Sequence, residues 1–199
     1  MNNIKLEKNT LDSKYLTTTE SKEKGITKYE LHKLTEAKMY DRVCRGIYIS
    51  TNELIDDLFI LHKRCPKAVF SHDEAFYYHH LTDREPLIHT LTIYTNYNSH
   101  RLLESGNCKI YSVKKELLNV GKTIITDYYG NQIPMYNLER TICDLVRNRN
   151  SIEIQEFNSV LKSYIARKDK DLNLLMEYAE LFHVQNIIRK YMEVLLWVN

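Results

Sequence analysis

Residues 17–50 read TTTESKEKGITKYELHKLTEAKMYDRVCRGIYIS, and this stretch decides how the rest of the chain is interpreted. Thr27 and Glu30 have the spacing of a capping box, in which the two side chains satisfy free backbone N–H groups at the start of a helix. Ile26, before the cap, and Leu31, at the fourth helical position, can pack together as a hydrophobic staple. The spacing therefore predicts a helix that begins at Thr27.

A second helix is predicted just upstream, because Thr17 and Glu20 repeat the capping-box spacing and a glycine supplies a turn between the two helices. On the downstream helix, Leu31 and Leu34 gather on one side with the stem of Lys38. The opposite side carries polar and basic residues: Lys28, Tyr29, His32, Lys33 and Glu36. Two short helices joined at glycine, the second with an exposed polar face, are typical of a helix-turn-helix that binds DNA.

Two short β-prone runs follow, MYDRVC and GIYIS, with glycine in their connection. They predict a hairpin, the wing of a winged helix, on which Arg42 and Arg45 can reach phosphates or a minor groove. The candidate DNA-binding residues are Thr27, Lys28, Tyr29, His32, Lys33, Arg42 and Arg45. A capped helix with outward lysines is also a common solvated surface, so it is the order of these features that favours DNA binding.

The composition limits the class of protein. A chain of 199 residues with 43% hydrophobic and 11% aromatic content can form one or two folded domains and is not typical of disorder. No apolar run is long enough to span a membrane, and the N-terminus lacks the apolar core of a signal peptide. The four cysteines are scattered without a CxxC pair, so we expect reduced thiols in a cytoplasmic protein and no zinc site.

The charge is distributed unevenly. Residues 1–50 carry ten Lys or Arg against seven Asp or Glu, whereas the remainder carries 18 against 19. The excess of positive charge is modest, and it falls on the segment where DNA binding requires it. We therefore divide the chain into a winged helix-turn-helix domain over residues 1–52 and a second domain over residues 53–199.

Two further helices are expected around the DNA-binding segment. Residues 3–15 can form a first, scaffolding helix with Ile4, Leu11 and Tyr15 roughly on one side. After the wing, Thr51 or Asn52 can cap a helix through residues 54–64, which would end at the Cys65-Pro66 pair.

The second domain is predicted to be α+β, with a small, mostly antiparallel sheet and helices packed around it. Ser71 to Glu74 has another capping-box spacing, ahead of a helix at 75–81. The β-prone runs cover residues 87–95, 108–113 and 122–136, the last with a Gly130-Asn131 turn. Asn137 is expected to cap a helix to residue 149, and three amphipathic helices follow it.

The residues offer no catalytic or cofactor site. His72, His79 and His80 are the densest histidine group, but neighbouring residues on a helix point about 100° apart and do not share a metal with ideal i, i+4 geometry. Arg140 and Asp144 can pair at i, i+4 on one helix. The five glycines are isolated, so no phosphate-binding loop is present. We expect no metal and no cofactor, and an enzyme is the less favoured hypothesis.

Three ordered blocks resemble the antitoxins of the AbiE type IV toxin–antitoxin family, which are bacterial abortive-infection proteins. The blocks are Arg42-Val43 with Arg45-Gly46-Ile47-Tyr48, then Ser71 to Leu81 with Pro86, then Leu138-Glu139-Arg140-Thr141 with Asp144. The likeness extends from about Thr17 to the last helices. Each block alone is common, and their order makes the resemblance specific. The chain departs from the pattern at Lys38, where many relatives have glycine before the wing.

The resemblance implies two activities. The winged helix would bind inverted repeats in double-stranded promoter DNA and repress its own operon. The C-terminal domain would counter a nucleotidyltransferase-like toxin without forming a stable complex with it. The alternative is a stand-alone winged-helix transcriptional regulator whose C-terminal domain binds a small ligand or dimerises. A downstream, overlapping gene for a nucleotidyltransferase-like protein would distinguish the two.

Overall fold

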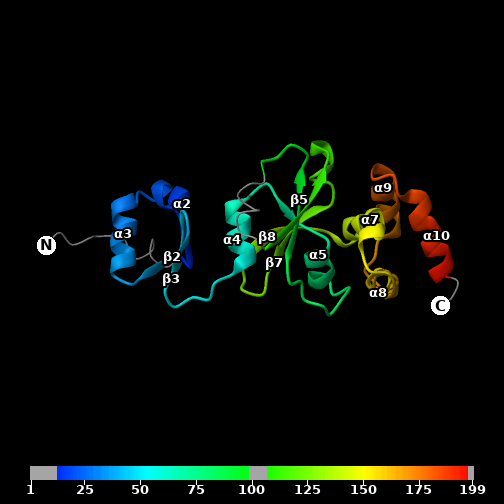
Figure 1. The fold of residues 1–199 in the computed structure, drawn as a ribbon, viewed down its shortest axis with the longest axis horizontal. Coiled ribbons are helices and arrows are strands. Elements are labelled where there is room, and N and C mark those ends of the chain that lie inside the picture. Colours follow the sequence, from blue (N-terminus) through cyan, green and yellow to red (C-terminus); the bar gives the residue numbers. More distant parts are fainter. Residues whose placement is uncertain (1–12, 99–106, 197–199) are drawn as a thin grey trace. The chain divides into compact units, whose positions relative to one another are not determined.

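The computed structural model describes residues 13–98 and 107–196. As predicted, the fold is α+β, and the described residues form eight α-helices and two β-sheets. The chain divides into two compact units, residues 1–60 (unit 1) and residues 61–199 (unit 2), which we describe separately (Figure 1). The division falls inside helix α4 (Asp57–Arg64), eight residues beyond the boundary placed after residue 52 from the sequence.

Unit 1 combines two short helices with a three-stranded antiparallel sheet of order β1-β3-β2. Its elements before α4 are β1 (Tyr15–Thr17), α2 (Thr18–Glu23), α3 (Lys28–Glu36), β2 (Tyr40–Cys44) and β3 (Ile47–Ser50). Both predicted helices and the predicted hairpin are therefore present. The helix expected over residues 3–15 is wrong at its end, because Tyr15 belongs to β1; residues 1–12 lie outside the described part of the chain.

Strand β1 explains why unit 1 has two apolar clusters. Neighbouring side chains of a strand point to opposite faces of the sheet. Leu16 packs with Leu31 and Leu34 of α3, whereas Tyr15 packs with Ile60 of α4 and with Ile49 of β3. A three-residue strand thus contacts the helices on one face of the sheet and α4 on the other. A segment this short leaves no pattern in the sequence that would predict it.

Helix α4 begins three residues later than predicted. The Asp56 carboxylate accepts the N–H of Phe59 at 3.1 Å, and the N–H of Asp56 donates to the Tyr15 hydroxyl at 3.0 Å. Asp56 is therefore the capping residue, in place of Thr51 or Asn52, because its backbone is held by a partner from β1. The predicted end is correct: α4 stops at Arg64, before Cys65-Pro66.

Unit 2 contains a five-stranded mixed sheet of order β6-β5-β4-β8-β7. The strands are β4 (Val69–Phe70), β5 (His89–Tyr94), β6 (Cys108–Val113), β7 (Lys122–Thr126) and β8 (Gln132–Tyr136). The pairs β4–β5 and β7–β8 are antiparallel, but β5–β6 and β4–β8 are parallel. The expectation of a mostly antiparallel sheet is therefore wrong, since a β-prone run does not state which neighbour it will pair with or in which direction.

Among the described residues of unit 2, one α-helix lies between β4 and β5 and four follow β8. They are α5 (Asp73–Tyr78), α7 (Leu138–Arg147), α8 (Ile154–Ala166), α9 (Leu172–Leu181) and α10 (Gln185–Leu196), with short 3₁₀ turns η1 (Lys115–Leu117) and η2 (Arg149–Ser151). Asn137 caps α7 as predicted, because its side chain accepts the Arg140 N–H at 3.0 Å. Trp197, assigned to the last amphipathic helix from the sequence, lies outside the described residues.

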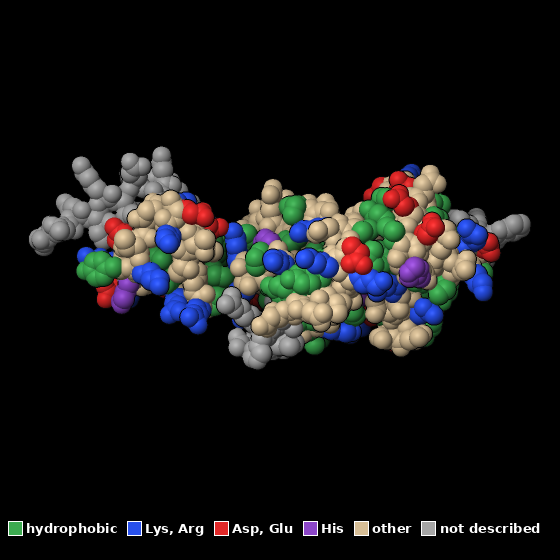
Figure 2. All heavy atoms as spheres, turned by 90° about the horizontal axis from the view of Figure 1, so that it is seen from above, with side chains coloured by type: hydrophobic (Ala, Val, Ile, Leu, Met, Phe, Trp, Pro, Cys, Tyr) green, Lys and Arg blue, Asp and Glu red, His purple; other side chains and the backbone are tan. Residues whose placement is uncertain are grey.

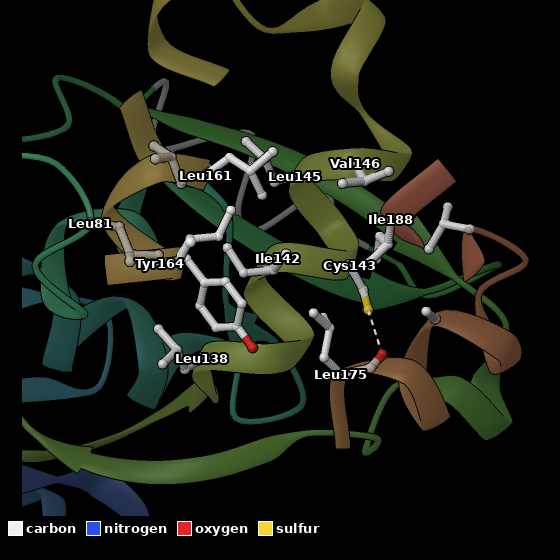
Figure 3. Close-up of a cluster of buried hydrophobic side chains, with 14 of the residues drawn as sticks. Leu81, Leu138, Ile142, Cys143, Leu145, Val146, Leu161, Tyr164, Leu175 and Ile188 are labelled. Carbon is white, nitrogen blue, oxygen red and sulfur yellow. Dashed lines mark hydrogen bonds between the residues drawn. The ribbon is translucent and has the colours of Figure 1, made fainter. Parts of the chain in front are cut away.

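Helix α7 is the centre of the core in unit 2. Nine of its ten residues are buried, because α5, α8, α9 and α10 all pack against it. Figure 3 shows Ile142, Leu145 and Val146 of α7 among side chains from the surrounding helices, with the Cys143 thiol directed at the carbonyl of Leu175. The apolar stripe of α7 was predicted, whereas its burial on the polar side was not.

The start of α5 differs from the sequence prediction. His72 precedes the helix in a left-handed backbone conformation with φ of 52°, and no side chain caps the helix from that position. The N–H of Glu74 is satisfied instead by the Thr90 hydroxyl at 3.0 Å, and the Glu74 carboxylate lies 2.6 Å from His89. The capping box expected at Ser71 is therefore wrong, because β5 supplies the hydrogen-bond partners.

Candidate nucleic-acid interface

Helices α2 and α3 are joined by a tight turn at Gly25. The Gly25 N–H donates to the carbonyl of Lys22 at 3.1 Å, and the Ile26 N–H donates to that of Ser21 at 2.7 Å. Gly25 has φ of 76°, a conformation that glycine adopts without the steric cost of a side chain. The turn therefore ends α2 and starts α3 with only four residues between the two helices.

The two capping boxes predicted for α2 and α3 are present. At α3, the Glu30 N–H donates to the Thr27 hydroxyl oxygen at 3.2 Å, and the Thr27 N–H donates to the Glu30 carboxylate at 2.7 Å. At α2, Thr17 and Glu20 make the same reciprocal pair at 3.1 and 3.2 Å. The side chain of Thr27 is thus engaged in starting the helix, which fixes the direction in which α3 leaves the turn.

The hydrogen bonds in the α3 cap also shift the pKa of Glu30. The backbone N–H and then the hydroxyl of Thr27 lower the pKa of Glu30 below its ordinary 4.5, since both stabilise the carboxylate. A lowered pKa in the folded state contributes stability above the ordinary value, which is lost as the pH falls through the folded pKa. At neutral pH the capping carboxylate is ionised and α3 is fully capped.

Helix α3 separates an apolar face from a polar one. Leu31 and Leu34 are buried against Leu16, Ile26 and Tyr40. The opposite face exposes Lys28, Tyr29, His32 and Glu36, with Lys33 half-buried beside them. Figure 2 shows basic, acidic, histidine and hydrophobic side chains together on the surface of unit 1 where α3 lies. The buried face of α3 packs on the core, and the exposed face leaves its side chains accessible to a partner.

Two interactions arrange the exposed face. The Tyr29 ring is 68% exposed, and the Lys33 ammonium lies 4.6 Å from the centre of that ring. His32 lies 3.8 Å from the Glu36 carboxylate one turn later, and both side chains are largely exposed. A single exposed aromatic ring is common on protein surfaces, so Tyr29 is accessible to a partner but does not by itself indicate one.

The hairpin carries the two arginines at its free end. In the β2–β3 pair, Arg42 pairs with Tyr48 and Cys44 with Ile47, so Val43 forms a bulge before the turn. Arg42 and Arg45 are both exposed, and the Arg42 side chain makes a long hydrogen bond of 3.4 Å to the carbonyl of Cys44. Bulges increase strand twist and redirect side chains, so this one sets the direction of the arginines.

The hairpin is held against α2 through Gly46. The Thr18 N–H donates to the Gly46 carbonyl at 2.9 Å, and an added Cβ at this glycine would lie 3.1 Å from the Thr18 hydroxyl. Gly46 also has φ of 82°, where a side chain would be strained. The turn of the hairpin is therefore fixed to the start of the helical pair, and Arg45 is presented by a rigid support.

Lys38 makes the connection from α3 to the hairpin. It has φ of 53° after the end of α3, and the Met39 N–H reaches back to the Leu34 carbonyl at 3.0 Å. This is the geometry of a helix C-terminus that favours glycine. The stem of Lys38 does not lie on the buried side of α3, as predicted from a longer helix; the residue is exposed beyond the helix end.

The structure thus places five of the seven predicted residues on α3 or its cap and two on the hairpin. The supporting elements adjoin each other, because α3 packs against β2. Sequence reasoning did not include three exposed lysines of unit 1: Lys22 on α2, Lys24 directly after it, and Lys38. The sequence showed these lysines only as positive charges, because none of them lies on a helix face that the apolar pattern marks as exposed.

Buried polar groups in unit 2 form hydrogen-bonded networks. The Asn148 side-chain amide donates to Nε2 of His72 at 2.9 Å. In that tautomer Nδ1 carries the proton and donates to the Ser71 hydroxyl at 3.0 Å. Burial lowers the pKa of His72 to about 4, so the ring is neutral at physiological pH. Across residues 13–98 and 107–196, no three His, Cys, Asp or Glu side chains are grouped so that they could hold a metal ion.

The predicted pair Arg140–Asp144 is present in α7, with Nε 3.1 Å from the carboxylate. Both side chains are almost completely buried, and the Arg140 guanidinium lies between the rings of Tyr136 and Phe182 at 3.9 and 4.0 Å. Its Nη1 donates to the carbonyls of Leu117 and Val120 at 3.1 and 2.8 Å. Arg140 thus joins α7 to the segment after β6.

No protein-family model matches the chain, and a search of curated proteins gives no match. In the part of the chain that the structure describes, no helix is both long and apolar enough to cross a membrane.

Proposed function

We propose that unit 1 is a winged helix-turn-helix that binds double-stranded DNA, with α3 as the recognition helix and the β2–β3 hairpin as the wing. The observation that carries the proposal is the exposed face of α3. It presents Lys28, Tyr29 and His32 from a helix whose other face is anchored in a core, next to a hairpin that exposes two arginines. An α-helix fits the major groove of B-DNA, which is about 12 Å wide.

The side chains suggest a division of labour on DNA. Lys28, Lys33, Arg42 and Arg45 are cations without a buried acidic partner among the described residues, which suits contacts to phosphates. Tyr29 and His32 lie in the first half of α3, where recognition helices contact base edges. Tyr29 offers an apolar ring for thymine methyl groups, and His32 offers a donor or acceptor.

We further propose that the chain is an antitoxin that also represses its own operon by binding inverted repeats in its promoter. The resemblance of the three ordered blocks to AbiE antitoxins supports this role. In that role unit 2 counters a nucleotidyltransferase-like toxin without a stable complex. The third block coincides with α7, whose Arg140 and Asp144 form the buried pair described above. These residues therefore support the core of unit 2, and the antitoxic surface lies elsewhere on the unit.

A stand-alone regulator is the second candidate function, and one observation favours it. Unit 2 has a surface pocket of about 370 Å³ at the carboxyl ends of two strands. Regulators that respond to a small molecule combine a DNA-binding unit with such a site. The presence of an overlapping downstream gene for a nucleotidyltransferase-like protein would favour the antitoxin.

The first prediction tests DNA binding through the salt dependence of affinity. Replacing Lys28 and Lys33 by Ala should weaken binding to promoter DNA and to random DNA alike, since phosphate contacts carry no sequence information. Each lost phosphate contact should reduce the slope of log K against log salt by about one unit. The measurement is fluorescence anisotropy over a series of salt concentrations.

A matched control is the double variant Lys162→Ala and Lys190→Ala, which removes two exposed lysines of unit 2. It should leave both the affinity and the slope unchanged. If the α3 variant keeps the wild-type affinity and slope, α3 is not the DNA-binding surface and the proposal is wrong.

A further inference from the structure

The pocket in unit 2 lies where two neighbouring parallel strands end. Its lining includes Thr95, directly after β5, and Ser112 to Lys114 at the end of β6. The two strands run parallel in register from His89–Cys108 to Tyr94–Val113. In open α/β sheets, ligands bind outside the carboxyl ends of parallel strands where the strand order reverses, and this pocket shares the first of these two features. The volume of about 370 Å³ falls within the range of small-molecule sites, roughly 300–1,000 Å³.

The walls combine an apolar floor with polar groups. Apolar contacts come from Val113, Leu117, Leu181 and Phe182, of which Phe182 is buried and Leu181 exposed. Polar groups come from Lys114, Glu116, Arg147 and His183. Such a lining can hold the apolar body of a ligand and still orient it through a few charged contacts. Figure 2 shows acidic, basic and histidine side chains close to hydrophobic ones in the part of unit 2 that contains α9.

The positive charge at this pocket exceeds the negative charge. Arg147 donates to the Asp144 carboxylate at 3.2 Å, but the other oxygen of that carboxylate already accepts from Arg140. Two guanidinium groups therefore share one carboxylate. Lys114 adds a further exposed cation, and Glu116 is the acid in the lining. The pocket thus has one positive charge more than its carboxylates neutralise.

Arg140 extends this charge behind the wall of the pocket. Its guanidinium stacks on Phe182 at 4.0 Å and donates to the Leu117 carbonyl, and both of these residues line the pocket. Its Nη2 is buried and has no hydrogen-bond partner among the described residues. Arg140 does not line the pocket itself, so it contributes a positive charge behind two residues that do.

His183 stands at the rim of the pocket in the short connection between α9 and α10. Its φ of 57° is a left-handed conformation, closed by the hydrogen bond from the Val184 N–H to the Ala179 carbonyl at 2.8 Å. The chain reverses direction at this position, which brings His183 to the same pocket as Lys114, a residue far from it in the sequence.

We propose that this pocket binds a small organic anion, a carboxylate or phosphate monoester carried on an apolar body. The anionic group contacts Arg147, Lys114 and His183, and the apolar body lies against Phe182 and Leu117. The site belongs to unit 2 alone. The proposal therefore does not depend on DNA binding by α3, and either can fail without the other.

The test is an amide chemical-shift titration of the full chain by NMR. The probes are phenyl phosphate and benzoate as the two anions, inorganic phosphate as an anion without a body, and benzyl alcohol as a body without a charge. We expect at least one organic anion to shift the amides of Thr95, Lys114 and His183, and to bind at least tenfold more tightly than benzyl alcohol. The stronger of the two anions identifies the phosphate or the carboxylate as the preferred group.

Variants assign the charge contacts. Arg147→Gln should weaken binding of the preferred anion about tenfold, which corresponds to one charge-assisted hydrogen bond. Lys114→Gln, an exposed position, should weaken it without any effect on folding, so it serves if Arg147→Gln disturbs α7. Glu116→Gln should tighten binding about twofold because it removes the opposing charge. Lys162→Gln, outside the pocket, should change nothing.

Four results would overturn the proposal, three of which concern the organic probes and the variants. These three are the absence of shifts at the pocket amides with either organic anion, binding of benzyl alcohol as tight as that of the anions, and wild-type affinity in both Arg147→Gln and Lys114→Gln. Binding of inorganic phosphate as tight as that of phenyl phosphate would remove the role of Phe182 and Leu117 and reduce the site to a charge contact, contrary to the proposal.

Discussion

At position 38 a lysine adopts a backbone conformation that favours glycine. Its φ of 53° costs an L-residue about 1–2 kcal/mol, whereas glycine reaches it freely. The conformation is retained because the surroundings fix it: the Thr51 hydroxyl donates to the Lys38 carbonyl at 2.9 Å, and the Thr51 N–H donates to that of Met39 at 3.1 Å. A glycine at this position would avoid the strain.

The second prediction follows from that strain. Lys38→Gly should raise the free energy of unfolding by about 0.5–1 kcal/mol, because relief of the left-handed strain exceeds the extra freedom that glycine has in the unfolded chain. Urea denaturation of the full chain measures the change. Lys38→Ala is the matched control, since it removes the same charge and keeps the strain. A gain in Lys38→Ala as large as in Lys38→Gly would show that charge, not backbone conformation, limits stability at this position.

At the scale of elements, the β2–β3 hairpin holds its two arginines away from the core of unit 1. The hairpin is fixed at Gly46 to the start of α2, and its exposed arginines make no ion pair with an acidic side chain among the described residues. Tyr40 of β2 and Ile47 and Ile49 of β3 enter the core of unit 1, whereas both arginines are exposed. The charge at the tip of the hairpin is therefore available for a partner without cost to folding.

The third prediction tests the wing. Arg45→Glu should abolish repression of a reporter placed behind the chain's own promoter, because a negative charge at the hairpin tip repels phosphates. The thermal unfolding temperature should stay within the range of the wild type, since Arg45 is exposed. Arg45→Lys keeps the charge and should retain most of the repression. Full repression by Arg45→Glu at normal expression would exclude the hairpin from the DNA-binding surface.

The elements that the sequence predicted well are those set by neighbours in the chain. Thr17 with Glu20 and Thr27 with Glu30 start their helices through hydrogen bonds that span three residues. The β2–β3 hairpin is likewise a local structure. The exposed face of α3 followed from the positions of Leu31 and Leu34, so most of the candidate site could be placed before the fold was known.

The elements predicted wrongly depend on partners distant in the sequence. Strand β4 has only two residues, and its place between β5 and β8 makes the sheet mixed. The α5 start was misjudged because Thr90, 16 residues further along, supplies the bond expected from Ser71. The pocket was not predicted for the same reason. Lys114, Arg147 and His183 come from three separate segments, and no spacing in the sequence links them.

At the scale of the whole molecule, the two units have separate cores. Unit 1 is built on two small clusters around its three-stranded sheet, whereas unit 2 is built around α7 and the helices that enclose it. The side chains proposed to bind DNA lie in unit 1 and do not belong to any of these clusters. Substitution at these positions should therefore leave both cores unchanged, which allows the two proposed activities to be separated in one full-length chain.

The last prediction is this separation. The triple variant Lys28→Ala, Lys33→Ala, Arg45→Glu should lose repression of its promoter but still rescue growth of cells that express the toxin at a fixed level from an unrelated promoter. Rescue persists because unit 2, which is proposed to counter the toxin, is untouched. Circular dichroism and thermal unfolding of the purified variant must match the wild type. If the folded variant fails to rescue growth, antitoxicity acts through DNA binding; unit 2 would then not be the antitoxic part, and the assignment of one activity to each unit would be wrong.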